Sequence, residues 1–260
     1  MKNPLAKTVL VTGASSGIGK ATAILFAKKG YNLIITGRRL SLIEELKIRL
    51  KRKYAVKVKG LNFDVRSYED TKTALKSLDV GWKKIDILIN NAGLASGLDP
   101  IHRGNIEDWN KMIDTNIKGL LHVTRLVSPG MVKRKSGTII NVCSTAGHEV
   151  YPNGNVYCAS KHAVNALTES IRLDLYKYGI KVGQVSPAHV EETEFAEVRY
   201  HGDKTKAKKL YENFQPLKSK DIAEIIYFMA TRPKHVNIQD VLVMGTQQAG
   251  STYIDRSGRS

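Results

Sequence analysis

Short apolar runs alternate along this chain with longer segments in which apolar residues recur at helical spacing. Residues 8–12 (TVLVT) form a β-branched run that ends at Gly13, and residues 18–29 then have helical spacing up to Gly30. The same alternation continues to residue 244. It predicts further strands at 32–36, 56–62, 85–90, 138–143, 181–186 and 240–244, and further helices at 40–53, 68–78, 109–133 with an interruption near Pro129, 156–178 and 219–231.

This order of elements predicts the fold class. Strands that alternate with helices imply parallel strands joined by helical crossovers. We expect a single-domain α/β protein of the Rossmann type, with a doubly wound sheet of about seven parallel strands and helices on both faces. No linker or repeat interrupts the pattern, so residues 1–260 are expected to form one domain. After Pro187 the pattern breaks into charged helical turns that reach Phe214, and we expect 188–218 to form a lid over a substrate.

Charge and composition indicate which kinds of partner and which cellular location to expect. The 41 Lys and Arg residues exceed the 24 Asp and Glu residues, for a net charge of +17. They are scattered without interleaved aromatic residues, so we expect a solvated surface and no nucleic-acid partner. The first seven residues contain no signal-peptide pattern, and no run of apolar residues is long enough for a membrane span. Cys143 and Cys158 lack metal-ligand spacing, and we expect both to be buried in a cytoplasmic protein.

The turn after the first predicted strand is rich in glycine. It reads TGASSGIG and includes Gly13, Ser15, Ser16, Gly17, Ile18 and Gly19. Glycines in a turn between a strand and a helix let backbone N–H groups approach a pyrophosphate at the helix N-terminus. The spacing G-x-x-x-G-x-G differs from the commoner dinucleotide fingerprint, but the flanking strand and helix favour a cofactor-binding turn.

The end of the second predicted strand indicates which dinucleotide is bound. An NAD-binding protein has an acidic residue there for the ribose 2′-hydroxyl, whereas this chain has Arg38 and Arg39. Two guanidinium groups suit a 2′-phosphate, and cations at a helix start are otherwise disfavoured by the helix dipole. We therefore expect the cofactor to be NADP.

Three side chains have the chemistry of a proton-transfer site. Tyr157 and Lys161 are four residues apart, so they share one face of the long predicted helix. A neighbouring cation stabilises a phenolate and would bring the tyrosine pKa closer to the working pH. Ser144 ends a strand at the sheet edge where ligands bind in open α/β folds, so its hydroxyl can polarise the same substrate oxygen.

Two asparagine-containing segments add to this set. Asn91, Ala92 and Gly93 close the strand at 85–90 and allow close approach of backbone and cofactor. Asn116 lies inside a predicted helix, where asparagine has only middling propensity. No cluster of His, Cys or carboxylate residues has metal-ligand spacing, so we expect no metal.

Together these segments resemble the short-chain dehydrogenase/reductase family from Lys7 to about Ala249: the glycine turn, NNAG, STAG (144–147) and YxxxK occur in the family's order. The resemblance implies that Ser144 and Tyr157 contact the substrate oxygen, that Lys161 binds the nicotinamide ribose and lowers the Tyr157 pKa, and that Asn116 supports a water-linked proton relay. It also implies a homotetramer. Further cofactor contacts implied by it are Asp64 and Val65 at the adenine, Asn91 near a ribose, and Pro187, Val190 and Thr193.

A closer resemblance is to the NADP-dependent 3-hydroxy acid (serine-type) dehydrogenases. It is carried by NNAGLASG, EDWNKMIDTNIKGL, STAGHEVYPNGNVY and TEFAEVRYHGDKTKA. One departure is Ala188, which stands where the family has glycine and puts the local backbone geometry in doubt. The resemblance implies reversible oxidation of a 3-hydroxy acid or a related secondary alcohol, with Tyr157 as general base in oxidation and general acid in reduction.

Substrate identity is open at this stage. A substrate carboxylate would need a cation, and the candidates are His148, His189, Arg199 and Lys204; Glu191 or Glu192 could meet an ammonium group. One alternative function is a broad-specificity carbonyl or ketone reductase with the same site. Another is an NADP-binding regulatory or nucleic-acid-binding protein, favoured by the net charge of +17 and disfavoured by the complete Ser-Tyr-Lys set.

Overall fold

A computed structural model describes residues 6–258 and shows one main β-sheet. Its seven strands are all parallel, in the order β3-β2-β1-β4-β5-β6-β9. This is the α/β sheet that the alternating apolar runs predict. The strands are β1 (Thr8–Val11), β2 (Asn32–Gly37), β3 (Val58–Asn62), β4 (Ile87–Asn90), β5 (Gly137–Val142), β6 (Ile180–Pro187) and β9 (Asp240–Val243).

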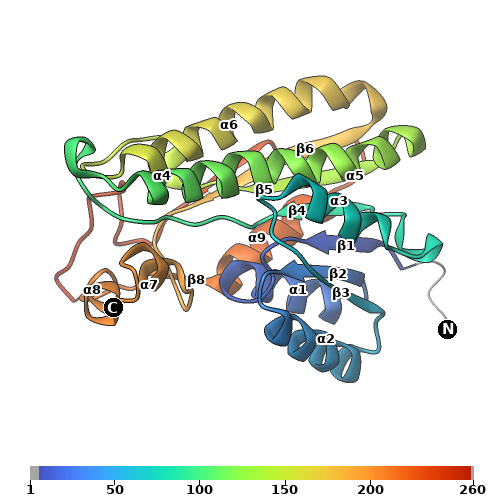
Figure 1. Cartoon of the computed structure of the whole chain (residues 1–260), viewed down its shortest axis with the longest axis horizontal. Coiled ribbons are helices and arrows are strands. Elements are labelled where there is room, and N and C mark those ends of the chain that lie inside the picture. Colours follow the sequence, from blue (N-terminus) through green and yellow to red (C-terminus); the bar gives the residue numbers. More distant parts are fainter. Residues whose placement is uncertain (1–5, 259–260) are drawn as a thin grey trace.

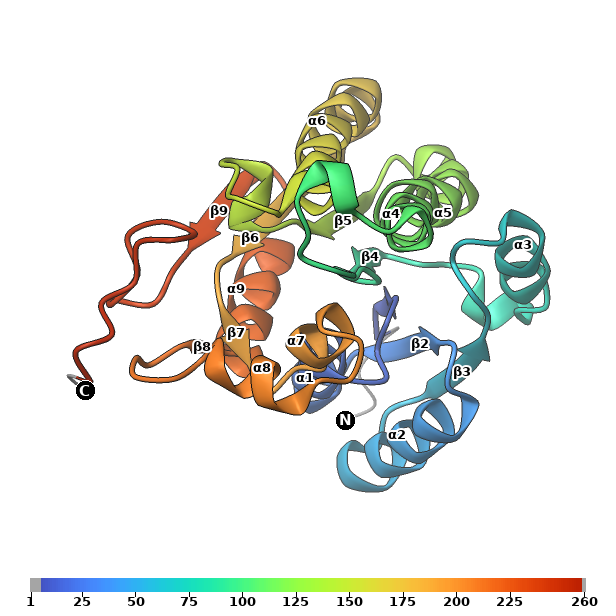
Figure 2. The same ribbon diagram turned by 60° about the vertical axis from the view of Figure 1, so that its left-hand side comes forward.

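Helices cover both faces of this sheet (Figures 1 and 2). One face carries α1 (Gly17–Lys28), α2 (Leu40–Tyr54) and α9 (Ser219–Thr231). The other carries α3 (Tyr68–Lys76), α4 (Ile106–Ile113), α5 (Leu120–Arg134) and α6 (Asn155–Leu175). The doubly wound arrangement expected from the sequence is therefore confirmed.

The strands are apolar at successive positions because both of their faces are buried. In β1, Val9 and Val11 point into the core that contains Phe26 of α1, while Leu10 points into the opposite core with Val127 of α5. All three β1 side chains are completely buried. Strands covered on both sides have this continuous apolar character rather than an apolar-polar alternation.

The order of the strands indicates where a ligand can bind. β1 pairs with β2 on one side and with β4 on the other, so the chain winds in opposite directions from this point. Val11, Ile35 and Ile89 lie in register near the carboxyl ends of these three strands. Ligands of open α/β sheets bind in the crevice at such a reversal. The glycine turn, the arginine pair and the NNAG segment all follow these strand ends.

The segment after β6 lies beyond the carboxyl ends of the strands, at the left of Figure 1. It contains β7 (Val190–Glu191), α7 (Phe195–Arg199), α8 (Lys204–Lys209) and β8 (Leu217–Lys218), and β7 pairs with β8 in a small parallel sheet. The short helices are the charged helical turns expected from the sequence. At Ala188 the φ is not positive and the N–H bonds Val243 O (2.9 Å), so its Cβ brings no backbone strain.

The interruption expected near Pro129 in the helix at 109–133 is wrong, because α5 continues through this residue. Pro129 cannot donate a hydrogen bond to the Arg125 carbonyl, but both residues are exposed, so water can satisfy that carbonyl. The irregularity lies earlier, where Asp114–Gly119 forms a π-helical segment between α4 and α5.

Cys143 and Cys158 are free thiols buried in the fold, as expected. Burial raises the pKa of the Cys143 thiol and keeps it in the neutral form. Across residues 6–258, no helix combines the length and the apolar character that a membrane crossing requires.

Candidate active site

Three glycines shape the turn between β1 and α1. Gly13 (φ +64°) and Gly17 (φ +51°) have left-handed backbone conformations that L side chains rarely adopt. Gly19 is needed for another reason, because a Cβ there would collide with Gly13 O and Asn91 Nδ2. The turn thus requires glycine for conformation at two positions and for close packing at the third.

The N-terminus of α1 has the character of an anion site. Ser16 is the N-cap, but its side chain makes no capping hydrogen bond, and the first turn contains no acidic residue. The first N–H groups of a helix have no intrahelical partner and lie at the positive end of its dipole. The backbone of Ser15 to Ile18 therefore fits the pyrophosphate of a dinucleotide.

Asn91 holds the glycine turn in place. Its Nδ2 donates to Thr12 O (2.9 Å) and Gly13 O (3.0 Å). The N–H groups of Asn91 and Ala92 both donate to Thr12 Oγ1 (3.0 Å each). The NNAG segment after β4 is therefore bonded directly to the turn after β1, a bracing role that the motif alone did not indicate.

Arg39 lies beside the glycine turn and binds a carboxylate. Its guanidinium donates to both oxygens of Glu194 (2.7 and 2.6 Å) and to Ser15 Oγ (3.1 Å). Ser16 Oγ also donates to Glu194 (2.9 Å). Hydrogen bonding by Arg39 holds the pKa of Glu194 below its usual value. A cluster of two hydroxyls and a guanidinium that binds an anionic carboxylate has the donors that a phosphate requires.

Arg38, Asp64 and Val65 lie at the same sheet edge. Burial raises the pKa of Asp64, but hydrogen bonds from Arg66 and the charges of Arg66 and Arg38 outweigh it and hold the pKa below its usual value. Asp64 pairs with Arg66 at 2.7 Å. Val65 is buried, with its side chain against Gly119. An apolar side chain beside a carboxylate at this edge suits an adenine ring.

Tyr157 of α6 is almost completely buried, with 7% of its surface exposed, and it faces Ser144 after β5. Burial raises its pKa above the usual value, and Tyr151 adds to that rise. A hydrogen bond with Ser144 and the positive charge of Arg199 act in the opposite direction without reversing it. The phenol is therefore protonated at neutral pH.

Lys161 lies one helical turn from Tyr157, with Nζ 5.9 Å from the centre of the phenol ring. Nζ donates to Val142 O (3.0 Å), and burial lowers the pKa of this ammonium. Burial raises the pKa of Tyr157 in this structure, so the lowering of that pKa by Lys161 that the family resemblance implies stays a prediction. Nζ also faces Gly93, where a Cβ would approach it to 3.6 Å.

Asn116 sits in the π-helical segment and joins two other parts of the site. Its amide bonds both backbone groups of Leu94 (2.9 Å each) and donates to Ser160 Oγ of α6 (3.0 Å). Its Oδ1 lies 3.2 Å from the position of a Cβ at Gly93. Single π-helical turns within α-helices often occur at functional sites. Here the π-helical turn carries the side chain that joins the loop after β4 to α6.

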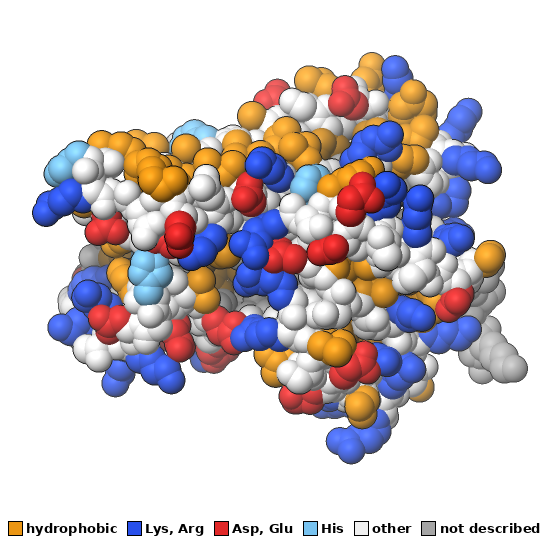
Figure 3. All heavy atoms as spheres, viewed as in Figure 1, with side chains coloured by type: hydrophobic (Ala, Val, Ile, Leu, Met, Phe, Trp, Pro, Cys, Tyr) orange, Lys and Arg blue, Asp and Glu red, His pale blue; other side chains and the backbone are white. Residues whose placement is uncertain are grey.

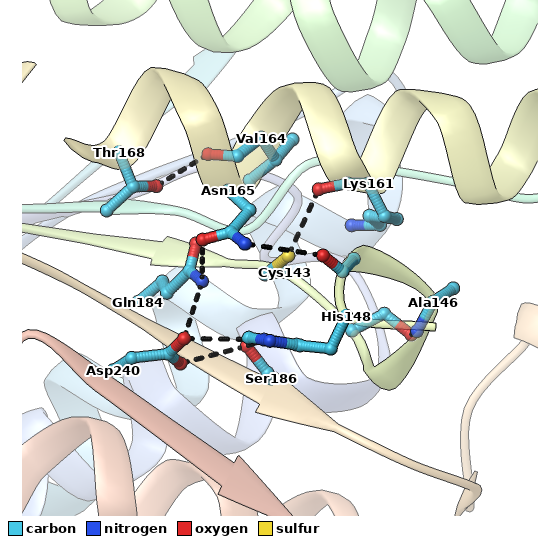
Figure 4. A network of polar contacts seen from close by, with 12 residues as sticks. Cys143, Ala146, His148, Lys161, Val164, Asn165, Thr168, Gln184, Ser186 and Asp240 are labelled. Atoms are coloured by element: carbon cyan, nitrogen blue, oxygen red, sulfur yellow. Dashed lines mark hydrogen bonds and ion pairs between the residues drawn. The ribbon is translucent and has the colours of Figure 1, made fainter. Parts of the chain in front are cut away.

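A partly buried polar network connects the helix of Lys161 to the sheet (Figure 4). Cys143 Sγ donates to Lys161 O (3.4 Å), and Gln184 Nε2 donates to both Asn165 Oδ1 (2.8 Å) and Asp240 Oδ2 (2.9 Å). Cys143 directly follows β5, and the other residues lie in α6, β6 and β9. The network fixes the position of α6, and with it the separation of Tyr157 and Lys161 from the strand ends.

The segment after β6 contributes the remaining cofactor residues expected from the sequence. Thr193 lies against the glycine turn, with Cγ2 3.0 Å from the position of a Cβ at Gly17. Val190 is buried, and its carbonyl accepts from Tyr211 Oη (3.1 Å). Pro187 ends β6 beside Val243 of β9. The segment after β6 is thus in contact with the glycine turn.

Two side chains of α7 cover the phenol. The Phe195 ring meets the Tyr157 ring edge to face at 5.5 Å, and the Arg199 guanidinium lies 5.5 Å from the centre of the same ring. Phe195 and Glu194 were not found from the sequence, because no motif shows which side chains the residues after β6 will contact. Arg199 was one of several candidates.

The structure therefore brings Ser144, Tyr157, Lys161 and Asn116 together at the carboxyl edge of the sheet, beside the glycine turn. A hydroxyl, a protonated phenol and an amine at this edge can bind a substrate oxygen and exchange a proton with it. Within the described part of the chain, no group of three or more His, Cys, Asp or Glu side chains is arranged to hold a metal ion.

Comparison with known proteins identifies the family. The model of the short chain dehydrogenase family matches residues 7–204. The chain belongs to the short-chain dehydrogenase family. An NADP-dependent 3-hydroxy acid dehydrogenase of Schizosaccharomyces pombe is 44% identical over 251 residues, which cover 96% of each chain. A probable NADP-dependent dehydrogenase of Haemophilus influenzae is 44% identical over 242 residues, 93% of this chain and 94% of the relative.

Solved structures are similar to this protein over nearly the whole chain. The closed form of a serine dehydrogenase complexed with NADP+ superposes with a TM-score of 0.89 at 43% identity, covering 93% of this chain and 96% of that one. A serine dehydrogenase from Escherichia coli has a TM-score of 0.81 at 38% identity, covering 93% of this chain and 99% of that one. The family resemblance expected from the motifs is confirmed.

Proposed function

We propose that this protein is an NADP-dependent oxidoreductase that interconverts a 3-hydroxy acid, serine-like or 3-hydroxypropionate-like, or a related secondary alcohol and its carbonyl. The observation that carries the proposal is the placement of Ser144, Tyr157 and Lys161 around one point beside the glycine turn. The names of the relatives support the cofactor and the substrate class. Bound NADP supplies the site that accepts or donates the hydride.

The chain's own residues bind the substrate oxygen and move its proton. Ser144 donates a hydrogen bond to that oxygen, and Tyr157 Oη gives it a proton in reduction or takes one in oxidation. Lys161 places a positive charge beside the phenol and the cofactor ribose. Asn116 keeps the loop after β4 bonded to α6 and supports the proton relay. Phe195 covers the phenol and excludes water.

NADP fits the residues at the sheet edge. The glycine turn and the N-terminus of α1 hold the pyrophosphate, and Arg38 and Arg39 with Ser15 hold the 2′-phosphate. The remaining contacts proposed are Ser16, Gly17, Ile18, Asp64, Val65, Asn91, Ala92, Gly93, Pro187, Val190 and Thr193. Because Arg39 is paired with Glu194 in this structure, the 2′-phosphate has to compete with that carboxylate.

An assay tests the function. Purified protein with NADP and a panel of 3-hydroxy acids, 2-hydroxy acids and simple secondary alcohols is followed by the absorbance of the reduced nicotinamide. We expect the largest kcat/KM on a 3-hydroxy acid. A preference for ketones and simple alcohols without a carboxylate would indicate a broad carbonyl reductase instead.

Replacing Arg39 with alanine is expected to weaken NADP binding selectively. A hydrogen bond to a charged group contributes about 1.5–3 kcal/mol, so KM for NADP should rise roughly 10- to 100-fold. KM for NAD, which lacks the 2′-phosphate, should change by less than about threefold. Arg52→Ala is the control, because it removes an exposed arginine of α2, the helix that Arg39 precedes. Equal losses for both cofactors would contradict the assignment.

The pH dependence should differ between the two directions. Burial, with Tyr151, raises the pKa of Tyr157, so the phenol that reduction needs is present at neutral pH, whereas the phenolate that oxidation needs is scarce. Oxidation kcat/KM should therefore rise by up to about tenfold per pH unit between about pH 7 and about pH 9, while reduction stays flat. Measured profiles in both directions check this, and oxidation that slows as pH rises through that window would refute it.

We further propose that the protein is a cytoplasmic homotetramer in which residues 188–218 cover the substrate. The family resemblance supports the assembly, as do exposed apolar side chains on and just after α5 and α6, namely Leu121, Leu173 and Tyr176. Lys and Arg side chains lie among acidic ones over the face in Figure 3, so no nucleic acid is expected to bind. Light scattering that finds a monomer, or a salt-sensitive gel shift with DNA or RNA, would overturn these points.

A further inference from the structure

Arg199, the last residue of α7, is a buried cation beside the phenol of the site. Only 7% of its surface is exposed, and its guanidinium lies between the rings of Tyr151 (5.3 Å) and Tyr157 (5.5 Å). Nη1 donates to Tyr151 Oη (3.0 Å). Nε and Nη2 are buried without a hydrogen-bond partner among the residues that the structure describes. A desolvated charge with unsatisfied donors is costly, so this arrangement calls for an anionic ligand.

The two free nitrogens have the geometry for a carboxylate. Nε and Nη2 lie on the same edge of the planar guanidinium and point in the same direction, which is the arrangement that binds both oxygens of a carboxylate. The backbone of Arg199 is also fixed, because its carbonyl accepts from the Gly97 N–H (2.9 Å) in the loop after β4. The cation is therefore held in place before a ligand binds, which lowers the entropic cost of binding.

The other cations considered from the sequence have different positions. His148 Nε2 lies 3.0 Å from Ser186 Oγ and 3.3 Å from the carboxylate of Asp240, within the polar network of Figure 4. His189 bonds Gln248 (2.8 Å), and burial lowers the pKa of its ring, which favours the neutral form. Lys204 begins α8 and is exposed. Arg199 alone among the four contacts the Tyr157 ring.

The two glutamates considered for a substrate ammonium group are near another cation. Lys218 Nζ lies 3.9 Å from Glu191 and 3.5 Å from Glu192, and Glu192 is largely exposed. Neither contact involves Tyr157. Among the charged candidates after β6, the one beside Tyr157 is therefore the cation Arg199.

We propose that Arg199 binds the substrate carboxylate and thereby makes the site selective for hydroxy acids. The inference rests on the proposed function. A 3-hydroxy acid placed with its hydroxyl at Tyr157 and Ser144 directs its carboxylate, one methylene from the reacting carbon, toward Nε and Nη2 of Arg199. Arg199 of α7 then binds the carboxylate end of the substrate, and Tyr157 binds its hydroxyl end. A neutral alcohol would leave the guanidinium unpaired, which selects against it.

The test compares 3-hydroxybutyrate with its methyl ester, which replaces the carboxylate by an uncharged group one methyl larger, in wild type and Arg199→Met. Methionine keeps much of the side-chain length without the charge. We expect the ratio of kcat/KM for the acid to that for the ester to fall at least about 100-fold, since an unpaired buried carboxylate is strongly disfavoured. The control, Lys204→Met, removes an exposed cation of the same lid and should leave the ratio within about threefold.

The same measurements distinguish a failure of the Arg199 inference from a failure of the proposed function. Equal losses on acid and ester, with an altered pH profile, would show that Arg199 acts on Tyr157 alone and would overturn the inference while leaving the function intact. Wild-type protein that oxidises neither compound would instead refute the proposed function. If Arg199→Met does not fold, Arg199→Lys replaces it in the test, because a lysine cannot bond both carboxylate oxygens side by side. Arg199→Lys should lower the acid-to-ester ratio of kcat/KM about tenfold. An unchanged ratio would overturn the inference.

Discussion

Replacing Tyr157 with phenylalanine is expected to lower kcat by about 10³-fold or more in both directions, while NADP still binds. The substitution removes only the hydroxyl that exchanges a proton with the substrate oxygen, and such proton transfer contributes about 10²- to 10⁴-fold to a rate. The ring itself remains, so its contact with Phe195 and its place in α6 are kept. The proposed NADP contacts of the glycine turn and the arginine pair are not touched by this substitution.

The measurements are kcat by the nicotinamide absorbance assay and the NADP dissociation constant by titration. Tyr176→Phe is the matched control, because it removes a phenol hydroxyl just after the end of the same helix, where the side chain is 67% exposed. It should change kcat by less than about twofold. Turnover of Tyr157→Phe within tenfold of wild type would show that another group moves the proton.

Replacing Gly19 with alanine is expected to raise the NADP dissociation constant at least about 100-fold. The added Cβ would overlap Gly13 O and Asn91 Nδ2, and it would lie 2.9 Å from the Gly13 carbonyl carbon. Backbone atoms cannot move aside as a flexible side chain can, so the turn has to shift. Overpacking of this kind also costs about 1–3 kcal/mol of stability. The loss of affinity follows because the displaced turn no longer presents its N–H groups to the pyrophosphate.

Calorimetric titration with NADP and thermal unfolding check this prediction together. Gly81→Ala is the control, since its Cβ would meet no heavy atom within 4 Å and the residue lacks a positive φ. That variant should bind NADP as wild type does. Unchanged affinity in Gly19→Ala would mean that the turn after β1 does not hold the cofactor.

The parallel sheet and the site segments could be predicted from sequence because their signals are local. A strand buried on both faces is apolar throughout, as β1 is, and the glycine turn must follow it directly. The pairing of Tyr157 with Lys161 follows from helical periodicity alone. Ser144 and Asn91 were found because each closes a strand, and parallel strands end at one edge.

Other features depend on contacts between distant segments, so the sequence did not reveal them. Arg39 and Glu194 are 155 residues apart, and no spacing rule pairs them. Arg199 rather than His189 contacts the phenol of Tyr157, and this depends on how the segment after β6 folds over the sheet edge. Whether the pKa of Tyr157 is raised or lowered depends on how deeply the ring is buried, which helical periodicity does not show. Asn116 in the π-helical segment likewise bonds Leu94 and Ser160, which are 22 and 44 residues away in the sequence.

The most direct test of the central claim is the transfer of deuterium from substrate to cofactor. The protein is incubated with NADP and 3-hydroxybutyrate deuterated at the carbon that bears the hydroxyl, and the cofactor is examined by NMR. If Ser144, Tyr157 and Lys161 act on one substrate oxygen beside the nicotinamide, the deuterium appears at the nicotinamide C4, and the transfer is lost in Tyr157→Phe. Deuterium that stays in the substrate while NADP is bound, or that is released to water, would contradict the account.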